Sequence, residues 1–145
     1  LPPNYEKMVI PERAFESTHA IFGVLFGKDM IEEYDVYKRT DNSDEDVVIA
    51  IVKFGTRVDG HKGVVHGGIL SLMLDDVLGF GFGALGVEKA FTANLTIDYR
   101  APVPARTRVK ISVQLDHREG RKLFWKAQIK SMDGSVLYTE ATSLY

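Results

Sequence analysis

The sequence predicts an α+β fold, in which an antiparallel six-stranded sheet wraps around a long central helix, preceded by a short N-terminal helix. Alternating apolar and polar residues predict strands on both sides of an apolar stretch that leaves no polar face, and turn-forming residues separate these strands. A helix that is apolar all round is expected to be buried, and half-buried strands supply the apolar faces that bury it. Because no repeat or second domain interrupts the pattern, residues 1–145 are expected to form a single domain.

A short helix and two strands are expected first. Pro11-Glu12-Arg13 is typical of a helix start, and apolar residues recur at helical spacing from there to Gly27. Residues 30–39 and 46–55 are rich in Tyr, Val and Ile, with the polar sequence TDNSDED between them. This pattern predicts a hairpin of two strands.

The central helix is expected in an apolar stretch that begins with VVHGGILSLMLDD, residues 64–76. The carboxylates Asp75 and Asp76 interrupt this stretch, and a carboxylate is costly to bury without a partner. No membrane span is expected, because the uncharged run on each side of the two aspartates is shorter than the about 18 apolar residues that a span needs.

Four antiparallel strands are expected after the helix. Alternation is clearest in residues 91–100, FTANLTIDYR, where every second residue is apolar or aromatic. Further alternating runs, separated by turn residues, occupy 109–115, 123–132 and 136–145.

Composition excludes several functional classes. The 18 Lys and Arg against 20 Asp and Glu leave a formal net charge of -2, so a nucleic-acid partner is not expected. Without cysteine the chain has no disulfide framework, thiolate nucleophile or cysteine zinc site, which fits an intracellular location, cytoplasmic or mitochondrial. No metal site is expected, because the four histidines, His19, His61, His66 and His117, show no zinc spacing beyond the pair His61 and His66 in a loop.

Gly67-Gly68 and Asp75 are the residues of the central stretch that point to chemistry. Glycines at the start of a buried helix expose N–H groups at the positive end of the helix dipole, which suits an oxyanion or a polarised carbonyl. The glycines alone would also fit a tight turn, and Asp75 could be a structural carboxylate bonded to Ser71 one turn back. The G-x-G-x-x-G sequence at residues 81–86 closes the helix instead of opening one, so a dinucleotide site is not expected.

The motif V-H-G-G-x6-D of residues 65–75, followed by FTANLTIDYRAP at 91–102, resembles the hotdog-fold acyl-CoA thioesterases. The nearest types are the phenylacetate-pathway enzymes and the eukaryotic thioesterase superfamily members. The resemblance extends from about Gly63 to Tyr145. It implies a hotdog fold and hydrolysis of an acyl-CoA thioester, as in fatty acid metabolism, with no cofactor except the CoA of the substrate.

The resemblance also implies roles for single residues. Asp75 would act as general base or nucleophile, and the Gly67 N–H would bind the oxyanion. Thr92 would position the water, with assistance from His66 or His61. Relatives often place an asparagine six residues before the motif histidine, where this chain has Gly60, and His61 is the candidate substitute. CoA is expected along two segments, at Tyr99, Arg100, Pro102, Arg118, Gly120, Arg121 and Lys122.

Helix geometry predicts a site that two chains share. Gly67 and Asp75 lie about 12 Å apart on one helix, at about 1.5 Å per residue. One thioester carbonyl cannot reach both groups, so they are expected to come from antiparallel helices of a homodimer, with a tetramer as a possible dimer of dimers.

Two other functions stay open at the level of sequence. A hotdog hydratase or dehydratase would carry an acid and histidine pair in its own motif, which this chain lacks. A non-catalytic acyl-CoA-binding protein would keep the fold, and Gly60 in place of the asparagine favours it. The sequence also does not distinguish a general-base route from a covalent one.

Overall fold

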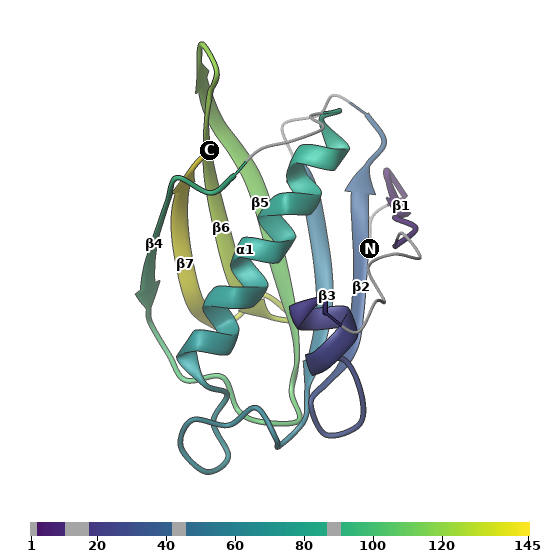
Figure 1. The fold of residues 1–145 in the computed structure, drawn as a ribbon, viewed down its shortest axis with the longest axis vertical. Helices are drawn as coiled ribbons and strands as arrows, with labels where there is room; N and C mark the ends of the chain where they lie inside the picture. The colour runs from purple at the N-terminus through teal and green to yellow at the C-terminus, as the bar shows by residue number, and fades with distance from the viewer. Residues whose placement is uncertain (1–2, 11–17, 42–45, 87–90) are drawn as a thin grey trace.

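The computed structural model describes residues 3–10, 18–41, 46–86 and 91–145, and these form one antiparallel sheet curved around one long helix (Figure 1). The helix, α1, spans Gly67–Ala84. The strands are β1 (Tyr5–Lys7), β2 (Ile31–Arg39), β3 (Val48–Phe54), β4 (Asn94–Tyr99), β5 (Arg108–Glu119), β6 (Lys122–Ser131) and β7 (Leu137–Leu144). Their order across the sheet is β1-β2-β3-β5-β6-β7-β4, which confirms the predicted sheet around a central helix.

The sheet has seven strands, so the prediction of six was wrong by one short edge strand. β1 pairs antiparallel with β2, from Tyr5 opposite Arg39 to Lys7 opposite Tyr37. Its three residues are too few to show an alternating pattern, and its position depends on the pairing with β2.

The N-terminal helix is shorter than predicted. The described helix, η2, is a short π-helix that spans Ala20–Leu25. His19 caps it by accepting hydrogen bonds from the N–H groups of Ile21 and Phe22 at 3.2 and 3.1 Å. The predicted start at Pro11-Glu12-Arg13 lies outside the described residues.

Only one side of α1 is buried, which corrects the prediction of a helix covered all round. Met73, Leu74, Val77 and Leu78 are fully buried against the sheet. The opposite side carries the exposed residues Gly68, Gly79 and Gly83, and a Cβ atom on Gly79 or Gly83 would meet no atom of the described residues within 4 Å. The apolar pattern failed here because a single curved sheet can cover only one side of a helix (Figure 1).

By length and composition alone, α1 would also qualify as a membrane span. Its contacts with β2, β3, β5 and β6 are those of a core helix, and Asp75 and Asp76 lie near its middle.

A glycine on α1 sets how closely the helix approaches the sheet. A Cβ on Gly81 would lie 3.1 and 3.2 Å from two ring carbons of Trp125 and 3.4 Å from Val113. Trp125 is fully buried, and its ring meets that of Phe82 edge-on at 5.5 Å between centroids.

We expect Gly81→Ala to lower the free energy of unfolding by about 1 kcal/mol. Overpacking costs about 1–3 kcal/mol and exceeds the about 1 kcal/mol that alanine gains in helix propensity. Urea denaturation measures the change, and Trp125→Phe provides the second side of a double-mutant cycle because phenylalanine lacks the two contacting carbons. An equal loss in both backgrounds would contradict the steric explanation.

Candidate active site

The start of α1 presents one free N–H group. His66 caps the helix, and its Nδ1 accepts a hydrogen bond from the Gly68 N–H at 2.8 Å. The N–H groups of Ile69 and Leu70 donate to the His66 carbonyl at 2.9 and 3.2 Å. Within the part of the chain that the structure describes, the Gly67 N–H has no acceptor. It is therefore the donor of the first turn that is available to a ligand.

The cap also determines how His66 presents its ring. Since Nδ1 accepts the bond from Gly68, the neutral imidazole carries its proton on Nε2, which can donate a hydrogen bond. Gly60 packs on this residue, because a Cβ there would lie 3.2 Å from the His66 Cα and 3.3 Å from its Cδ2. An asparagine at position 60 would require His66 to shift, so the departure at Gly60 is coupled to the observed position of His66.

Tyr99, the last residue of β4, holds the start of α1 in place. Its hydroxyl donates to the Gly67 carbonyl at 3.0 Å and lies 2.6 Å from the Ser71 hydroxyl, which also reaches that carbonyl at 3.1 Å. The Tyr99 ring lies 3.4 Å from the position of a Cβ on Gly67. A residue expected to contact CoA thus also positions the expected oxyanion donor.

A cavity of about 520 Å³ opens beside the start of α1. It brings together six of the predicted site residues, which are His61, His66, Gly67, Tyr99, Arg100 and Pro102. Asp75 and Thr92 do not line it, so one chain presents the two parts of the predicted site in different places.

Asp75 lies half-buried on α1 and is held by two hydroxyl groups. Its Oδ1 accepts a hydrogen bond from Thr92 at 2.5 Å and from Tyr145 at 3.1 Å. The structure therefore brings Thr92 to Asp75, whereas its expected role of orienting a water stays a prediction. The prediction missed Tyr145, although it continues the inward-facing alternation of Ala141 and Ser143 in the last strand. Ser71 bonds the start of the helix and not Asp75.

Asp76 has a different environment from its neighbour. Its Oδ2 accepts a hydrogen bond from Tyr34 on β2 at 2.7 Å, and the Tyr34 ring stacks on Phe22 at 5.3 Å between centroids. Burial raises the pKa of Asp76, and the bond from Tyr34 and the charge of His19 oppose this increase. Asp76 therefore has a structural partner inside the chain, while Asp75 lies beside the exposed side of α1.

The second predicted CoA segment lies far from the first. Arg118, Gly120, Arg121 and Lys122 are exposed on and beside the β5–β6 hairpin turn. In Figure 1 this hairpin is at the top, whereas α1 begins at the bottom, near the end of β4. The backbone of Tyr145 is hydrogen-bonded to Leu123, which directly follows the hairpin turn. The Tyr145 hydroxyl that holds Asp75 therefore lies toward the same end of the molecule as this hairpin.

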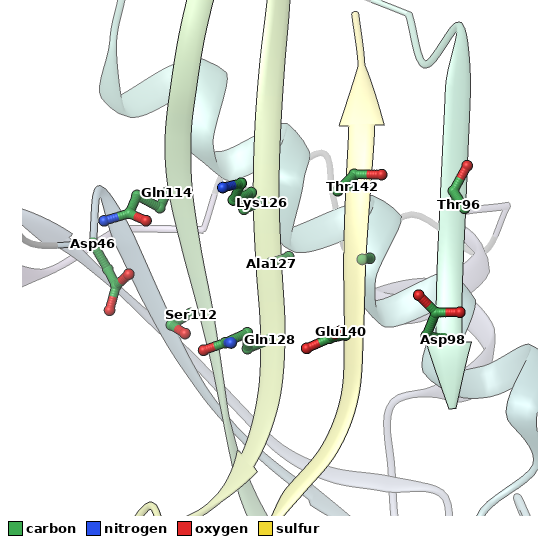
Figure 2. Close-up of a pocket in the computed structure, with 11 residues that line it drawn as sticks. Asp46, Thr96, Asp98, Ser112, Gln114, Lys126, Ala127, Gln128, Glu140 and Thr142 are labelled. Carbon is green, nitrogen blue, oxygen red and sulfur yellow. The ribbon is translucent and has the colours of Figure 1, made fainter. Parts of the chain in front are cut away.

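A second hollow, of about 370 Å³, lies on the face of the sheet away from α1 (Figure 2). Polar side chains from four strands point into it, among them Thr96, Ser112, Gln128 and Glu140. Glu140 accepts a hydrogen bond from Arg100 at 2.7 Å. The sheet separates this hollow from Asp75 and Gly67, so it is not part of the candidate site.

We expect the free energy of unfolding of Asp76→Asn to increase relative to that of the wild type as the pH rises. Burial raises the folded-state pKa of Asp76 above 3.8, so the folded chain binds this proton more tightly than the unfolded chain. The wild type therefore loses stability as the pH rises from about 4 through the raised pKa, and the asparagine does not titrate. Its amide oxygen can still accept the Tyr34 hydroxyl.

Urea denaturation of both proteins at pH 4 and pH 7.5 measures this difference. Asp133→Asn is the control, because hydrogen bonds from Ser135 and Ser131 lower the pKa of Asp133 to about 2. Asp133 is already ionised at pH 4 in the folded chain, so its substitution should not become more favourable with pH. A trend for Asp76→Asn that is flat or reversed would contradict the cost of burying this carboxylate.

Comparison with known proteins places this fold and motif in a family. The family model described as Thioesterase superfamily matches residues 62–138. The acyl-coenzyme A thioesterase THEM4 of Bos taurus is 39% identical over 113 residues, which cover 78% of this chain and 45% of that protein. The chain thus spans about half the length of the curated relatives that it matches.

Solved structures agree with this assignment. The crystal structure of a thioesterase superfamily protein has a TM-score of 0.67 and 28% identity, and covers 77% of this chain and 52% of that one. A hypothetical thioesterase of Streptococcus pneumoniae TIGR4, solved with coenzyme A, has a TM-score of 0.66 and 20% identity, and covers 78% of this chain and 84% of that one. The chain therefore belongs to the thioesterase superfamily and has its hotdog fold.

Proposed function

We propose that this chain hydrolyses acyl-CoA thioesters to a free acid and CoA, with no cofactor except the CoA of the substrate. The observation that carries the proposal is the free Gly67 N–H at the start of α1, in a cavity that the expected CoA segment also lines. The names of the THEM4 relatives and the coenzyme A in the Streptococcus structure support this substrate class.

The geometry supports a simple division of roles. The Gly67 N–H donates a hydrogen bond to the negative charge that develops on the thioester oxygen, and Nε2–H of His66, which lines the same cavity, is a second donor. Asp75 supplies the carboxylate, because it is the aspartate of α1 that lies beside the exposed side of the helix. His61 lines the same cavity and remains the candidate substitute for the asparagine that Gly60 replaces.

Two routes give the same products. In the first, Asp75 takes a proton from water, the hydroxide adds to the thioester carbon, and the tetrahedral intermediate collapses to acid and CoA thiolate, which receives the proton. In the second, the Asp75 carboxylate attacks the carbon and displaces CoA thiolate, and water then hydrolyses the mixed anhydride. Both routes need Asp75 ionised and the oxyanion held by Gly67.

We further propose that each site combines groups from two chains in a homodimer. Gly67 and Asp75 are about 12 Å apart along one helix, and the cavity beside Gly67 excludes Asp75. An antiparallel pair of chains would bring the Gly67 cavity of one to the Asp75 carboxylate of the other. It would also unite the Tyr99–Pro102 segment of one chain with the partner's hairpin at residues 118–122.

Two surfaces of the chain support this pairing. β4 lies at the edge of the sheet, with β7 on one side and none of the described strands on the other. The exposed side of α1 carries Gly79 and Gly83, where the absence of a side chain permits close approach of a second helix. A tetramer built as a dimer of dimers remains a prediction.

We expect the chain to release thiol from a panel of acyl-CoA substrates, and Asp75→Asn to lower turnover at least about 100-fold while the fold and dimer persist. Both routes require the charge that asparagine removes. A thiol reagent measures the rate, and Asp76→Asn is the matched control, since Asp76 is occupied by Tyr34. A chain that binds acyl-CoA without releasing thiol would be a non-catalytic binder, and equal losses in both variants would contradict the role of Asp75.

We expect two inactive variants to restore activity when their chains are mixed. Gly67→Pro removes the N–H, and its Cβ would meet Tyr99 at an ordinary contact distance of 3.4 Å. Proline is also favoured in the first turn of a helix. In a mixed dimer with Asp75→Asn, one site carries both lesions and the other carries neither. About a quarter of all sites should recover in an equal, randomly reassociated mixture.

Gly67→Ala is the control for this experiment, because it adds the same Cβ but keeps the N–H and should stay active. Circular dichroism checks the fold of each variant, and native mass spectrometry checks that mixed dimers and any tetramers form. No recovery in confirmed mixed dimers would mean that both groups act within one chain or that Gly67 is not the donor.

A further inference from the structure

The two oxygens of Asp75 have different surroundings. Oδ1 accepts both hydroxyl hydrogen bonds, from Thr92 at 2.5 Å and from Tyr145 at 3.1 Å. Oδ2 has no hydrogen-bond partner among residues 3–10, 18–41, 46–86 and 91–145. One oxygen is thus held inside the chain, and the other is available to a group outside it.

Tyr145 is held in place both by its backbone and by its ring. Its backbone pairs with Leu123 in both directions, N–H to carbonyl at 3.0 Å and carbonyl to N–H at 2.9 Å. Its ring meets Phe82 edge-on at 4.0 Å between centroids, and Phe82 lies about two turns after Asp75 on α1. The strand and the helix together therefore aim this hydroxyl at Asp75.

We propose that Tyr145 is a positioning residue that orients the Asp75 carboxylate, so that Oδ2 is the oxygen that takes the proton from water or attacks the thioester. This proposal rests on the proposed thioesterase function. A carboxylate held at Oδ1 by two donors cannot rotate freely about its terminal bond, so Oδ2 keeps one direction. The hydrogen bond from Thr92 would fix that direction less well by itself, because the carboxylate could still turn about the axis of a single hydrogen bond.

Tyr145 remains a hydrogen-bond donor at neutral pH. Burial, with the charge of Asp75, raises the pKa of Tyr145 to about 12. The hydroxyls of Thr92 and Ser143 act in the opposite direction. Tyr145 thus stays protonated at neutral pH, and it holds the carboxylate without exchanging a proton with the substrate.

The first test is Tyr145→Phe, which keeps the ring on Phe82 and removes only the hydroxyl. We expect kcat to fall about 3- to 10-fold with KM unchanged. Tyr37→Phe is the control, since it also removes a tyrosine hydroxyl, but from β2, which lies near the opposite edge of the sheet from β7. An unchanged kcat in Tyr145→Phe, a rise in KM in place of a fall in kcat, or the same fall in kcat in Tyr37→Phe would overturn the proposal.

The second test does not need activity. In protein labelled with ¹³C at the tyrosine Cζ, the Tyr145 signal is assigned by its loss in Tyr145→Phe. It should remain mostly protonated at pH 11 in the wild type and should ionise at lower pH in Asp75→Asn, because the neighbouring negative charge is gone. Equal titration in both proteins would show that the two residues are not in contact and would overturn the proposal.

The two tests separate this inference from the proposed function. Thiol release that is absent in the wild type would refute the thioesterase proposal, and the tyrosine titration would still decide whether Tyr145 holds Asp75. Thiol release that depends on Asp75 but not on Tyr145 would support the proposed function and refute the inference.

Discussion

The rise of an α-helix is the constraint on which the proposed chemistry depends. It keeps Gly67 and Asp75 about 12 Å apart, whatever surrounds α1. The curved sheet then buries Met73, Leu74, Val77 and Leu78 and leaves the opposite side of the helix exposed. A chain built in this way presents the proposed oxyanion donor in one place and the carboxylate in another, and the proposed homodimer would bring them together.

Asp75 and Asp76 show how adjacent residues of one helix acquire different properties. Successive residues point about 100° apart around the helix axis, so one carboxylate faces β2 and the other the hydroxyls of Thr92 and Tyr145. The Tyr34 bond supplies the partner that a buried carboxylate needs, while burial still raises the pKa of Asp76. Asp75 avoids much of that cost by its position beside the exposed side of α1.

The helix start shows a similar division between neighbours. His66 uses its side chain to satisfy Gly68 and leaves Gly67 with a free N–H. The free N–H shares its peptide group with the His66 carbonyl, which accepts hydrogen bonds from the N–H groups of Ile69 and Leu70. Tyr99 and Ser71 hold the carbonyl of the next peptide group, that of Gly67. An oxyanion donor is most effective when it is already oriented before the reaction, because no free energy is then spent on turning it.

The sequence by itself determined the central helix, the strands that follow one another in hairpins and the candidates Gly67 and Asp75, because periodicity and motif spacing are local properties of the chain. Thr92 became a candidate through the resemblance to a family. The sequence did not show β1, whose three residues depend on pairing with β2, or the exposed side of α1, which depends on how far the sheet curves. The hydrogen bond from Tyr145 to Asp75 and the contact between Gly60 and His66 were decided only by the tertiary structure. These contacts join residues whose neighbours in sequence give no signal of the partner, since the distance between them is set by the packing of the sheet on the helix.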